Sequence, residues 1–314
     1  MRNVTINKND SGQRLDKFLT KYFKNMPQSA VYKYIRKKRV KVNGKKSDIA
    51  YRLSEGDVLS LYINDEFFED KTKGSFLNIQ PNLNILYEDE NILLADKQFG
   101  MVVHEDKNEK TDTLINHIKA YLYNKGEYDP KNENSFSPAL CNRIDRNTGG
   151  IVIAAKTSEA LKIINEKIKN REIKKFYLCL VSGHLKNKSG LLTGYLFKDC
   201  KKNTVYVYDS EKKGAKIIKT KYKVIEERDD CSLVEAELIT GRTHQIRAHF
   251  AHIGHPLIGD GKYGTNEINK KHHLYHQALY SYKIKFDFSN ENILSYLNGR
   301  TFCANNVPFA KKEI

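Results

Sequence analysis

The chain of 314 residues fits one large or two ordinary domains, and its apolar fraction of 39% is enough for a buried core. No run of residues approaches the roughly 20 apolar positions that a membrane-spanning helix needs. Five cysteines, an odd number without a CxxC pair, indicate neither a disulfide framework nor a zinc ribbon. Because the N-terminal residues also lack an apolar signal segment, the sequence predicts a protein of the reducing cytoplasm.

The net charge of +16 is concentrated near the N-terminus. Residues 1–64 hold 15 basic and 5 acidic side chains, whereas the remaining residues hold 39 basic and 33 acidic ones. A strongly basic head on a nearly balanced body favours a module that docks on a polyanion. On composition alone, a solvated surface without a binding role is the alternative.

The head is predicted to be a compact module of two helices and a small sheet. Apolar residues recur at helical spacing over residues 14–24, and a second short helix follows Pro27. Alternating valines lead into an Asn43-Gly44 turn, which indicates a hairpin, and residues 58–61 supply another strand. The outer side of the second helix and the residues after it carry the cations Lys33, Arg36, Lys37, Lys38 and Arg39.

Residues 65–82, with several acids and a Gly-Ser pair, are predicted to link this module (residues 1–64) to a larger unit over residues 83–314. The elements expected in the larger unit are a strand–turn–strand, a polar loop, a buried strand, a helix and five further strands over residues 85–98, 124–138, 151–155, 157–170, 176–181, 204–208, 217–225, 231–239 and 281–288. Since strands outnumber helices, we expect an α+β fold around a mixed, mainly antiparallel sheet with flanking helices.

A first candidate site lies in the segment NRIDRNTGG, residues 142–150, just before the buried strand. Asp145 stands between Arg143 and Arg146, and neighbouring guanidinium groups favour the anionic form of a carboxylate. The two glycines allow a sharp turn in which side chains would not fit. A permanently charged carboxylate suits nucleophilic attack or charge stabilisation, and a structural ion pair in a tight turn is the alternative.

A second candidate site is TGRTHQIRAHF, residues 240–250, which is expected to open a helix. Arg242 follows a glycine, from which its guanidinium could reach a carboxylate in bidentate fashion. The metal-ligand hypothesis rests on four histidines, His244, His249, His252 and His255. It is weak, because the segment has no HExxH pattern and Gly254 and Pro256 should end the helix.

Tyr177, in the segment KKFYL, opens a predicted strand. A tyrosine in that place is more often part of a core, although an aromatic ring can also stack on an unpaired base. The sequence contains neither GxGxxG nor GxxxxGK[ST], so a nucleotide cofactor is not expected.

The segments NRIDRNTGGIVIAAKT and ELITGRTHQIRAHFAHIGHPLIGDGKYG strongly resemble the RluA/RluC/RluD-type ribosomal RNA pseudouridine synthases. The resemblance extends over residues 85–309 and includes DKQFGMVVH, KKFYLCLVSG and LYHQALYSYKIKF. The basic head is similar to the RNA-binding module named after ribosomal protein S-four, which often precedes this catalytic domain.

This resemblance implies an isomerase that converts uridine in RNA to its C-glycoside isomer, without a metal or a cofactor. Asp145 would act at ribose carbon 1′ as a nucleophile or at carbon 2′ as a base, and the sequence does not choose between these routes. Arg242 would pair with Asp145, Tyr177 would stack on the base and take the proton from carbon 5, and Arg143 would fill the space of the extruded nucleotide. The implied partner is RNA, bound by a monomer with no membrane contact.

One position departs from the family pattern, since Asn142 stands where histidine is usual. We expect it to alter hydrogen bonding near the site or contacts to RNA, with the chemistry retained. The basic head favours large-subunit ribosomal RNA as the substrate, because family members that act on small RNAs often lack it. The alternatives are transfer RNA as the substrate, a non-catalytic ribosome-assembly factor, and a metal-dependent phosphodiesterase built on His244, His249 and His255.

Overall fold

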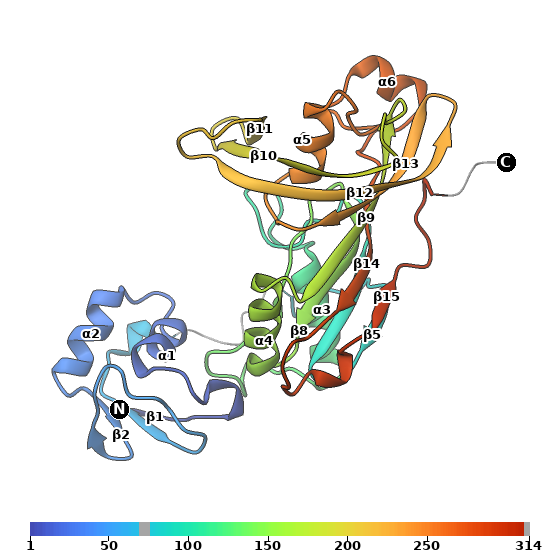
Figure 1. Ribbon diagram of the computed structural model, residues 1–314. Helices are drawn as coiled ribbons and strands as arrows, with labels where there is room; N and C mark the ends of the chain where they lie inside the picture. Colours follow the sequence, from blue (N-terminus) through green and yellow to red (C-terminus); the bar gives the residue numbers. More distant parts are fainter. Residues whose placement is uncertain (69–75, 311–314) are drawn as a thin grey trace.

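Residues 1–68 and 76–310 are described in the computed structural model of the chain (Figure 1). Residues 69–75 of the predicted linker lie outside these ranges. The strands form two separate sheets, a small one near the N-terminus and a large one in the rest of the chain. Within the described ranges, no helix has the length and apolar composition of a membrane span. The predicted α+β class is confirmed.

The N-terminal module contains a four-stranded antiparallel sheet in the order β1-β4-β2-β3. Its elements are β1 (Arg2–Thr5), a 3₁₀ turn (Lys8–Asp10), α1 (Leu15–Tyr22), α2 (Gln28–Arg36), β2 (Val40–Val42), β3 (Lys45–Lys46) and β4 (Val58–Leu61), followed by a second 3₁₀ turn (Asp65–Phe67). Both predicted helices are confirmed, and β1 was not expected. Positive φ angles of 50° at Asn43 and 76° at Gly44 form the predicted hairpin turn between β2 and β3.

The large sheet has eleven strands, nine of them in the order β11-β10-β12-β13-β9-β14-β8-β6-β5, with β15 beside β14 and β7 beside β8. All pairs are antiparallel except β14 with β8, which agrees with the predicted mixed sheet. The strands are β5 (Ile85–Glu88), β6 (Ile92–Lys97), β7 (Ala139–Leu140), β8 (Gly149–Ala155), β9 (Ile173–Ser182), β10 (Ser189–Asp199), β11 (Thr204–Tyr208), β12 (Lys216–Arg228), β13 (Cys231–Leu238), β14 (Leu279–Phe286) and β15 (Thr301–Cys303). The helices are α3 (Leu114–Asn124), α4 (Ser158–Lys169), α5 (Gln245–His252), α6 (Asn266–Lys271) and a 3₁₀ turn (Ser295–Leu297).

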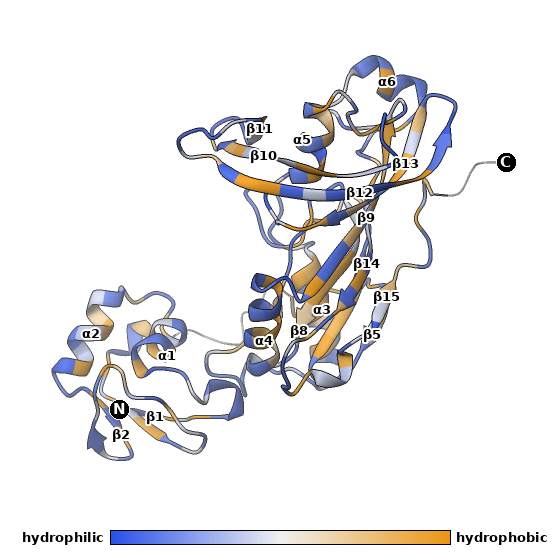
Figure 2. Cartoon of the chain, viewed as in Figure 1, coloured by the Kyte–Doolittle hydropathy of each residue, from blue (hydrophilic) through white to orange (hydrophobic). Residues whose placement is uncertain are grey.

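Helices cover both faces of this sheet at β8. Val152 and Ala154 of β8 pack in the core that contains residues of α3 and α5, whereas Ile151 and Ile153 pack in the core that contains α4. Side chains of a strand alternate between faces, so a strand covered on both sides is apolar throughout. Figure 2 shows the resulting apolar colouring within the body. The face toward α3 and α5 also holds the candidate site.

The N-terminal module contacts the body through polar side chains. The fully buried carboxylate of Asp10 accepts hydrogen bonds from the Asn134 amide at 2.8 Å and from the Ser135 hydroxyl at 2.6 Å. Asn9 donates to Glu133 at 2.8 Å and accepts from the backbone N–H of Ser158 at the start of α4. Residues 125–138 contain no helix or strand, which confirms the predicted polar loop except for residue 124, where α3 ends. Hydrogen bonds of this loop join the basic head to the body.

Candidate active site

The loop that carries Asp145 joins β7 to β8 and ends in two glycines. At Gly150 the backbone has φ +112°, and an added Cβ would lie 2.2 Å from the carbonyl oxygen of Ser281 on the neighbouring strand β14. Only glycine fits this approach, because β8 and β14 are paired directly there. The backbone N–H of Thr148 donates to the carbonyl of Asp145 at 3.0 Å, which closes the turn and leaves the carboxylate side chain 28% exposed.

The cation beside Asp145 is Arg247, on the first turn of α5. One of its terminal nitrogens, Nη1, is 2.8 Å from Asp145 Oδ2, while Nε and Nη2 donate to both oxygens of the fully buried Asp260 at 2.7 and 2.9 Å. Burial opposes the charge of this guanidinium, but the bonds to Asp260 and the nearby Asp145 outweigh it and raise the pKa of Arg247. Asp260 thus fixes the guanidinium, and the guanidinium fixes the Asp145 carboxylate.

The prediction that Arg242 pairs with Asp145 was wrong. Arg242 is exposed, and its backbone N–H donates to the side chain of Gln245 at 3.1 Å, ahead of the helix. Among the described ion pairs, Asp145 is matched with Arg247 and His244. The expected guanidinium is therefore present but comes from the second arginine of the same motif, since the helix begins at Gln245 and turns position 247 inward.

His244 completes the polar surroundings of Asp145. It has left-handed backbone (φ 51°), a conformation that costs a non-glycine residue about 1 kcal/mol or more. Its Nδ1 lies 2.9 Å from the hydroxyl of Tyr263, and that hydroxyl already accepts from the N–H of Val205. The Nε2 atom of His244 lies 3.8 Å from Asp145. Burial lowers the pKa of His244 although Asp145 opposes the shift, which favours a neutral ring.

Tyr177 is a core residue that also lines the cavity beside Asp145. Its ring belongs to the core of the body and is 5% exposed, and it also lines the same cavity as Asp145. Burial raises the pKa of Tyr177 to about 12, although a hydrogen bond with Ser281 opposes the shift. The hydroxyl is thus protonated at neutral pH, so it can accept a proton only if its own proton leaves in the same step.

Lys97, at the end of β6, holds the Asp145 loop through hydrogen bonds to backbone carbonyl oxygens. Its buried ammonium donates to the carbonyl oxygens of Gln98, Met101 and Arg146 at 2.8, 2.8 and 2.9 Å. Burial lowers the pKa of Lys97 to about 7, and the Asp145 carboxylate acts against that shift. Because Arg146 directly follows Asp145, this ammonium fixes the backbone beside the carboxylate.

We expect Lys97→Met to destabilise the fold by about 2 kcal/mol, because three carbonyl oxygens lose their donor. The turnover number should fall by about 10²-fold, since small displacements of a reacting group have effects of that size. Urea unfolding and single-turnover rates on uridine RNA would measure both effects, with Lys186→Met, at an exposed position, as the control. An unchanged rate at position 97 would show that the Asp145 loop keeps its place without this ammonium.

A cavity of about 890 Å³ lies at the carboxylate. It is lined by the predicted site residues Asp145, Tyr177, Arg143 and Arg242, and by Arg247. Eight lysine and arginine side chains line this cavity against two carboxylates, which are Asp145 and Glu237. A pocket of this size whose lining is strongly basic suits an anionic ligand.

Asn142 lines the cavity, but its side chain is directed to the neighbouring strand. Its amide oxygen accepts from the N–H of Ile153 at 2.8 Å, and its amide nitrogen donates to the carbonyl of Ile151 at 3.4 Å. In this chain the side chain at position 142 therefore joins the loop to β8. It places no titratable group at this position.

The five predicted RNA-binding cations of the head, Lys33, Arg36, Lys37, Lys38 and Arg39, are all exposed. Within the described part of the chain, none of them is paired with a carboxylate. Their charges are therefore free to meet an anionic partner.

The histidines of the second motif do not gather around a common point. Besides His244, which faces Tyr263, His249 Nδ1 lies 3.1 Å from the Thr220 hydroxyl, and His255 Nδ1 lies 2.8 Å from the Ser182 carbonyl. His252 pairs with Asp209. This arrangement gives no support to the phosphodiesterase alternative.

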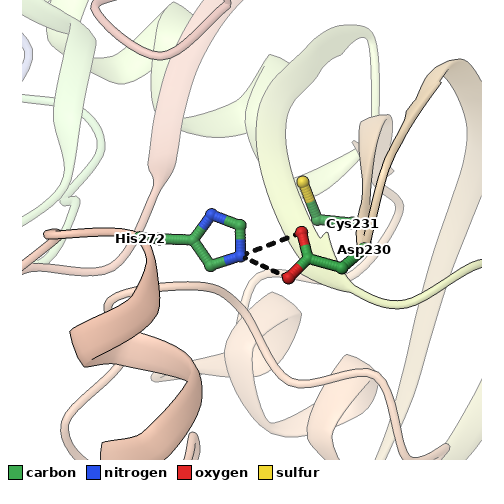
Figure 3. A group of neighbouring side chains, drawn as sticks. All are labelled: Asp230, Cys231 and His272. Atoms are coloured by element: carbon green, nitrogen blue, oxygen red, sulfur yellow. Dashed lines mark hydrogen bonds and ion pairs between the residues drawn. The ribbon is translucent and has the colours of Figure 1, made fainter.

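A different trio with metal-ligand chemistry lies at the far end of β13 from the cavity. Figure 3 shows Asp230, Cys231 and His272, whose donor atoms lie within 4.8 Å of one another. The carboxylate of Asp230 is already paired with the ammonium of Lys271 at 2.5 Å and with His272 at 3.2 Å. The negative charge of Asp230 is therefore balanced by neighbouring side chains. The trio is not part of the candidate site.

Comparison with known proteins decides the family. The family model described as RNA pseudouridylate synthase matches residues 91–252, and the S4 domain model matches residues 13–59. The chain belongs to the RNA pseudouridine synthase family. Members of this family are isomerases, and both the resemblance noted in the sequence and the isomerase class that it implied are confirmed.

Curated relatives cover nearly the whole chain. An uncharacterized RNA pseudouridine synthase of Mycoplasma capricolum is 33% identical over 97% of this chain and 98% of its own length. Ribosomal large subunit pseudouridine synthase C of Vibrio vulnificus is 33% identical over 90% and 87%. The solved structure of human RNA Pseudouridylate Synthase Domain Containing 1 matches with a TM-score of 0.55 at 22% identity over 70% of this chain and 82% of that chain, which shows a shared fold.

Proposed function

We propose that this pseudouridine synthase isomerises uridines in large-subunit ribosomal RNA. The observation that supports it most directly is a carboxylate, Asp145, held 2.8 Å from the Arg247 guanidinium in a cavity lined mainly by basic residues. An anionic group next to ribose suits a glycosidic bond that breaks through a transition state with positive character on the sugar. The basic lining suits the phosphates on either side of the target nucleotide.

We assign the chemical step at ribose to Asp145, as a nucleophile at carbon 1′ or as a base at carbon 2′. Once the N-glycosidic bond has broken, the base rotates and its carbon 5 bonds to carbon 1′. On the first route the bond between carbon 1′ and Asp145 breaks in this step, and on the second route Asp145 returns its proton to carbon 2′. The proton of carbon 5 must then leave, and Tyr177, in the same cavity, is the proposed route for it. Arg143 is exposed at the cavity, where it can fill the space that an extruded nucleotide leaves, and extrusion costs least in loops and bulges.

Two observations favour ribosomal RNA over transfer RNA. The chain has an S4 domain ahead of its catalytic domain, and several of its relatives are named ribosomal large subunit pseudouridine synthase C. A ribosomal substrate also implies the compartment where ribosomes are assembled, in line with the expected cytoplasmic location. The alternative of a non-catalytic assembly factor has less support, because the carboxylate and its guanidinium partner are both in place.

Tritium release tests the proposal. RNA transcribed with uridine labelled at carbon 5 loses tritium to water when pseudouridine forms, whereas mass does not change because the product is an isomer. We expect release from large-subunit ribosomal RNA fragments and none from small-subunit RNA or transfer RNA. Release from transfer RNA alone would contradict the proposed substrate, and no release from any RNA would contradict the proposed activity.

We further propose that residues 1–64 act as an RNA-docking module for a catalytic domain over residues 83–314. Replacing Lys33, Arg36, Lys37 and Lys38 by glutamine in the full chain should weaken RNA binding. The slope of log affinity against log salt should become shallower by roughly 3, because each lost phosphate contact removes about 1 unit or slightly less. Fluorescence anisotropy titrations at several salt concentrations would measure this slope, and an unchanged slope would exclude the docking role.

A further inference from the structure

A polar interface joins the N-terminal module to the body. The module contributes the turn between β1 and α1, and the body contributes the loop before β7 and the first residue of α4. The interface consists of Asn7, Asn9, Asp10 and Gln13 on one side and of Glu133, Asn134, Ser135 and Ser158 on the other. In Figure 1 it lies where the module meets α4. The chemistry at Asp145 does not use these residues.

Asp10 forms the centre of the polar interface. Its carboxylate is fully buried, and both of its oxygens accept bonds from the body. Oδ2 accepts from the Asn134 amide at 2.8 Å, and Oδ1 accepts from the backbone N–H and the hydroxyl of Ser135 at 3.2 and 2.6 Å. A buried carboxylate needs such donors, and hydrogen bonds are directional. These bonds therefore favour one orientation of the module.

Glu133 and Ser158 extend the contact on either side of Asp10. Glu133 accepts from the side chains of Asn9 at 2.8 Å and Asn7 at 3.2 Å. The side-chain oxygen of Asn9 in turn accepts from the backbone N–H of Ser158 at 3.1 Å. The module is thus bonded to two segments of the body, which opposes rotation about a single contact.

These two segments flank the element that carries Asp145. Residues 133–135 precede β7, and Ser158 follows β8, with which β7 is paired. The loop of Asp145 joins these two strands. The module is therefore bonded to the chain on both sides of the hairpin that holds the reacting carboxylate.

The polar interface leaves the basic surface of the module free. The five cations described above lie at the end of α2 or directly after it, whereas the interface is formed by residues 7–13, ahead of α1. In Figure 1, α2 lies on the side of the module that is turned away from α4. Binding of RNA to these cations is therefore compatible with an intact interface.

We propose that the polar interface determines which uridine is modified, by fixing the distance and the orientation between RNA held on the module and Asp145. This inference rests on the proposed function and on the docking role of the module. A module in a fixed place presents one uridine of a bound RNA to the cavity, whereas a module that moves relative to the body would present several. Asp10 and Asn134 are thus positioning residues, which act through the placement of the module.

The test exchanges the two central partners in the full chain. Asn134→Asp places a second carboxylate against that of Asp10 and should separate the module from the body, because like charges at hydrogen-bond distance repel. D10N/N134D reverses the pair, so that an amide of the module donates to a carboxylate of the body, and should restore the contact. Asn124→Asp adds the same charge at an exposed position of α3 and is the control. Small-angle X-ray scattering should show a larger radius of gyration for Asn134→Asp alone.

The choice of uridine is measured on transcribed large-subunit ribosomal RNA, by carbodiimide treatment and primer extension. For Asn134→Asp we expect the kcat/KM at the preferred uridine, relative to other uridines, to fall by about 10-fold, because a preorganised contact is replaced by a mobile one. On a single-stranded uridine oligomer too short to reach the module, kcat/KM should stay within about two-fold for every variant. D10N/N134D should regain most of the selectivity, and Asn124→Asp should resemble the wild type.

The outcomes separate this inference from the proposed function. A larger radius of gyration for Asn134→Asp with an unchanged choice of uridine would overturn the role of the interface and leave the activity in place. An unchanged radius of gyration would also overturn it, because the module would then be held by other contacts. An equal loss of kcat/KM on the short oligomer would indicate damage to the catalytic domain and would contradict a positioning role. No pseudouridine from the wild type in any RNA would overturn the activity itself.

Discussion

Asp145→Asn should abolish isomerisation and leave RNA binding nearly unchanged. Asparagine keeps the size of the side chain and can still accept a hydrogen bond from Arg247, but it has no negative charge to act at ribose. We expect tritium release to fall by at least about 10³-fold, since removal of a reacting group has effects of that size or more. The dissociation constant for a stem-loop should stay within about three-fold, because the basic lining of the cavity is intact.

Thermal unfolding and a control variant separate a loss of chemistry from a loss of folding. Thermal unfolding should show a fold that is destabilised by about 1 kcal/mol at most, because Arg247 keeps both of its bonds to Asp260. Glu159→Gln removes an exposed carboxylate on α4 and should have the activity of the wild type. Undiminished release by the asparagine variant would remove Asp145 from the chemistry, whatever the family of the chain.

Much of the fold was predictable because the patterns are local. The apolar run at residues 151–155 reads as a buried strand since both of its faces are covered, and β8 extends it by only two residues. Thr157 caps α4 through its side chain, and the predicted helix over residues 157–170 matches it within one residue at each end. In these two segments, the local preference of the side chains for strand or helix agrees with the faces that are buried in the fold.

The elements that were missed depend on contacts between distant residues. α3 lacks a clear polar face, because Asn116 and His117 are buried among its apolar residues. β10 contains two glycines, which disfavour strands, yet a Cβ at Gly190 would lie 2.9 Å from the Tyr222 ring on β12. The sequence cannot show that a neighbouring ring needs this space.

The candidate site shows the same division between local and distant information. Asp145, Tyr177, Arg143 and Arg242 were all expected near one another, and one cavity contains all four. Which arginine contacts the carboxylate depends on where α5 begins, and helix ends are the least predictable feature of a sequence. The fully buried Asp260, which holds Arg247 from the other side, lies thirteen residues farther along the chain.

Arg247→Met should therefore be far more damaging than Arg242→Met. Removal of the guanidinium leaves the buried carboxylate of Asp260 without its bidentate partner, which should lower the free energy of unfolding by about 3–5 kcal/mol. Tritium release should fall to background, because Asp145 also loses the group that orients it. Arg242 is exposed and has no acidic partner among the described residues, so its loss should change stability by less than about 0.5 kcal/mol and act mainly on KM.

Arg247→Lys keeps the test decisive if the methionine variant does not fold. An ammonium preserves the charge but cannot bond to Asp260 and Asp145 in the same fork geometry. We expect a folded protein whose kcat is reduced by about 10²-fold, because the carboxylate is less well oriented while RNA binding is retained. Urea unfolding and single-turnover tritium release on the three arginine variants would rank the two positions. A larger loss of kcat at position 242 than at position 247 would restore the pairing expected from the sequence and refute the one seen in the structure.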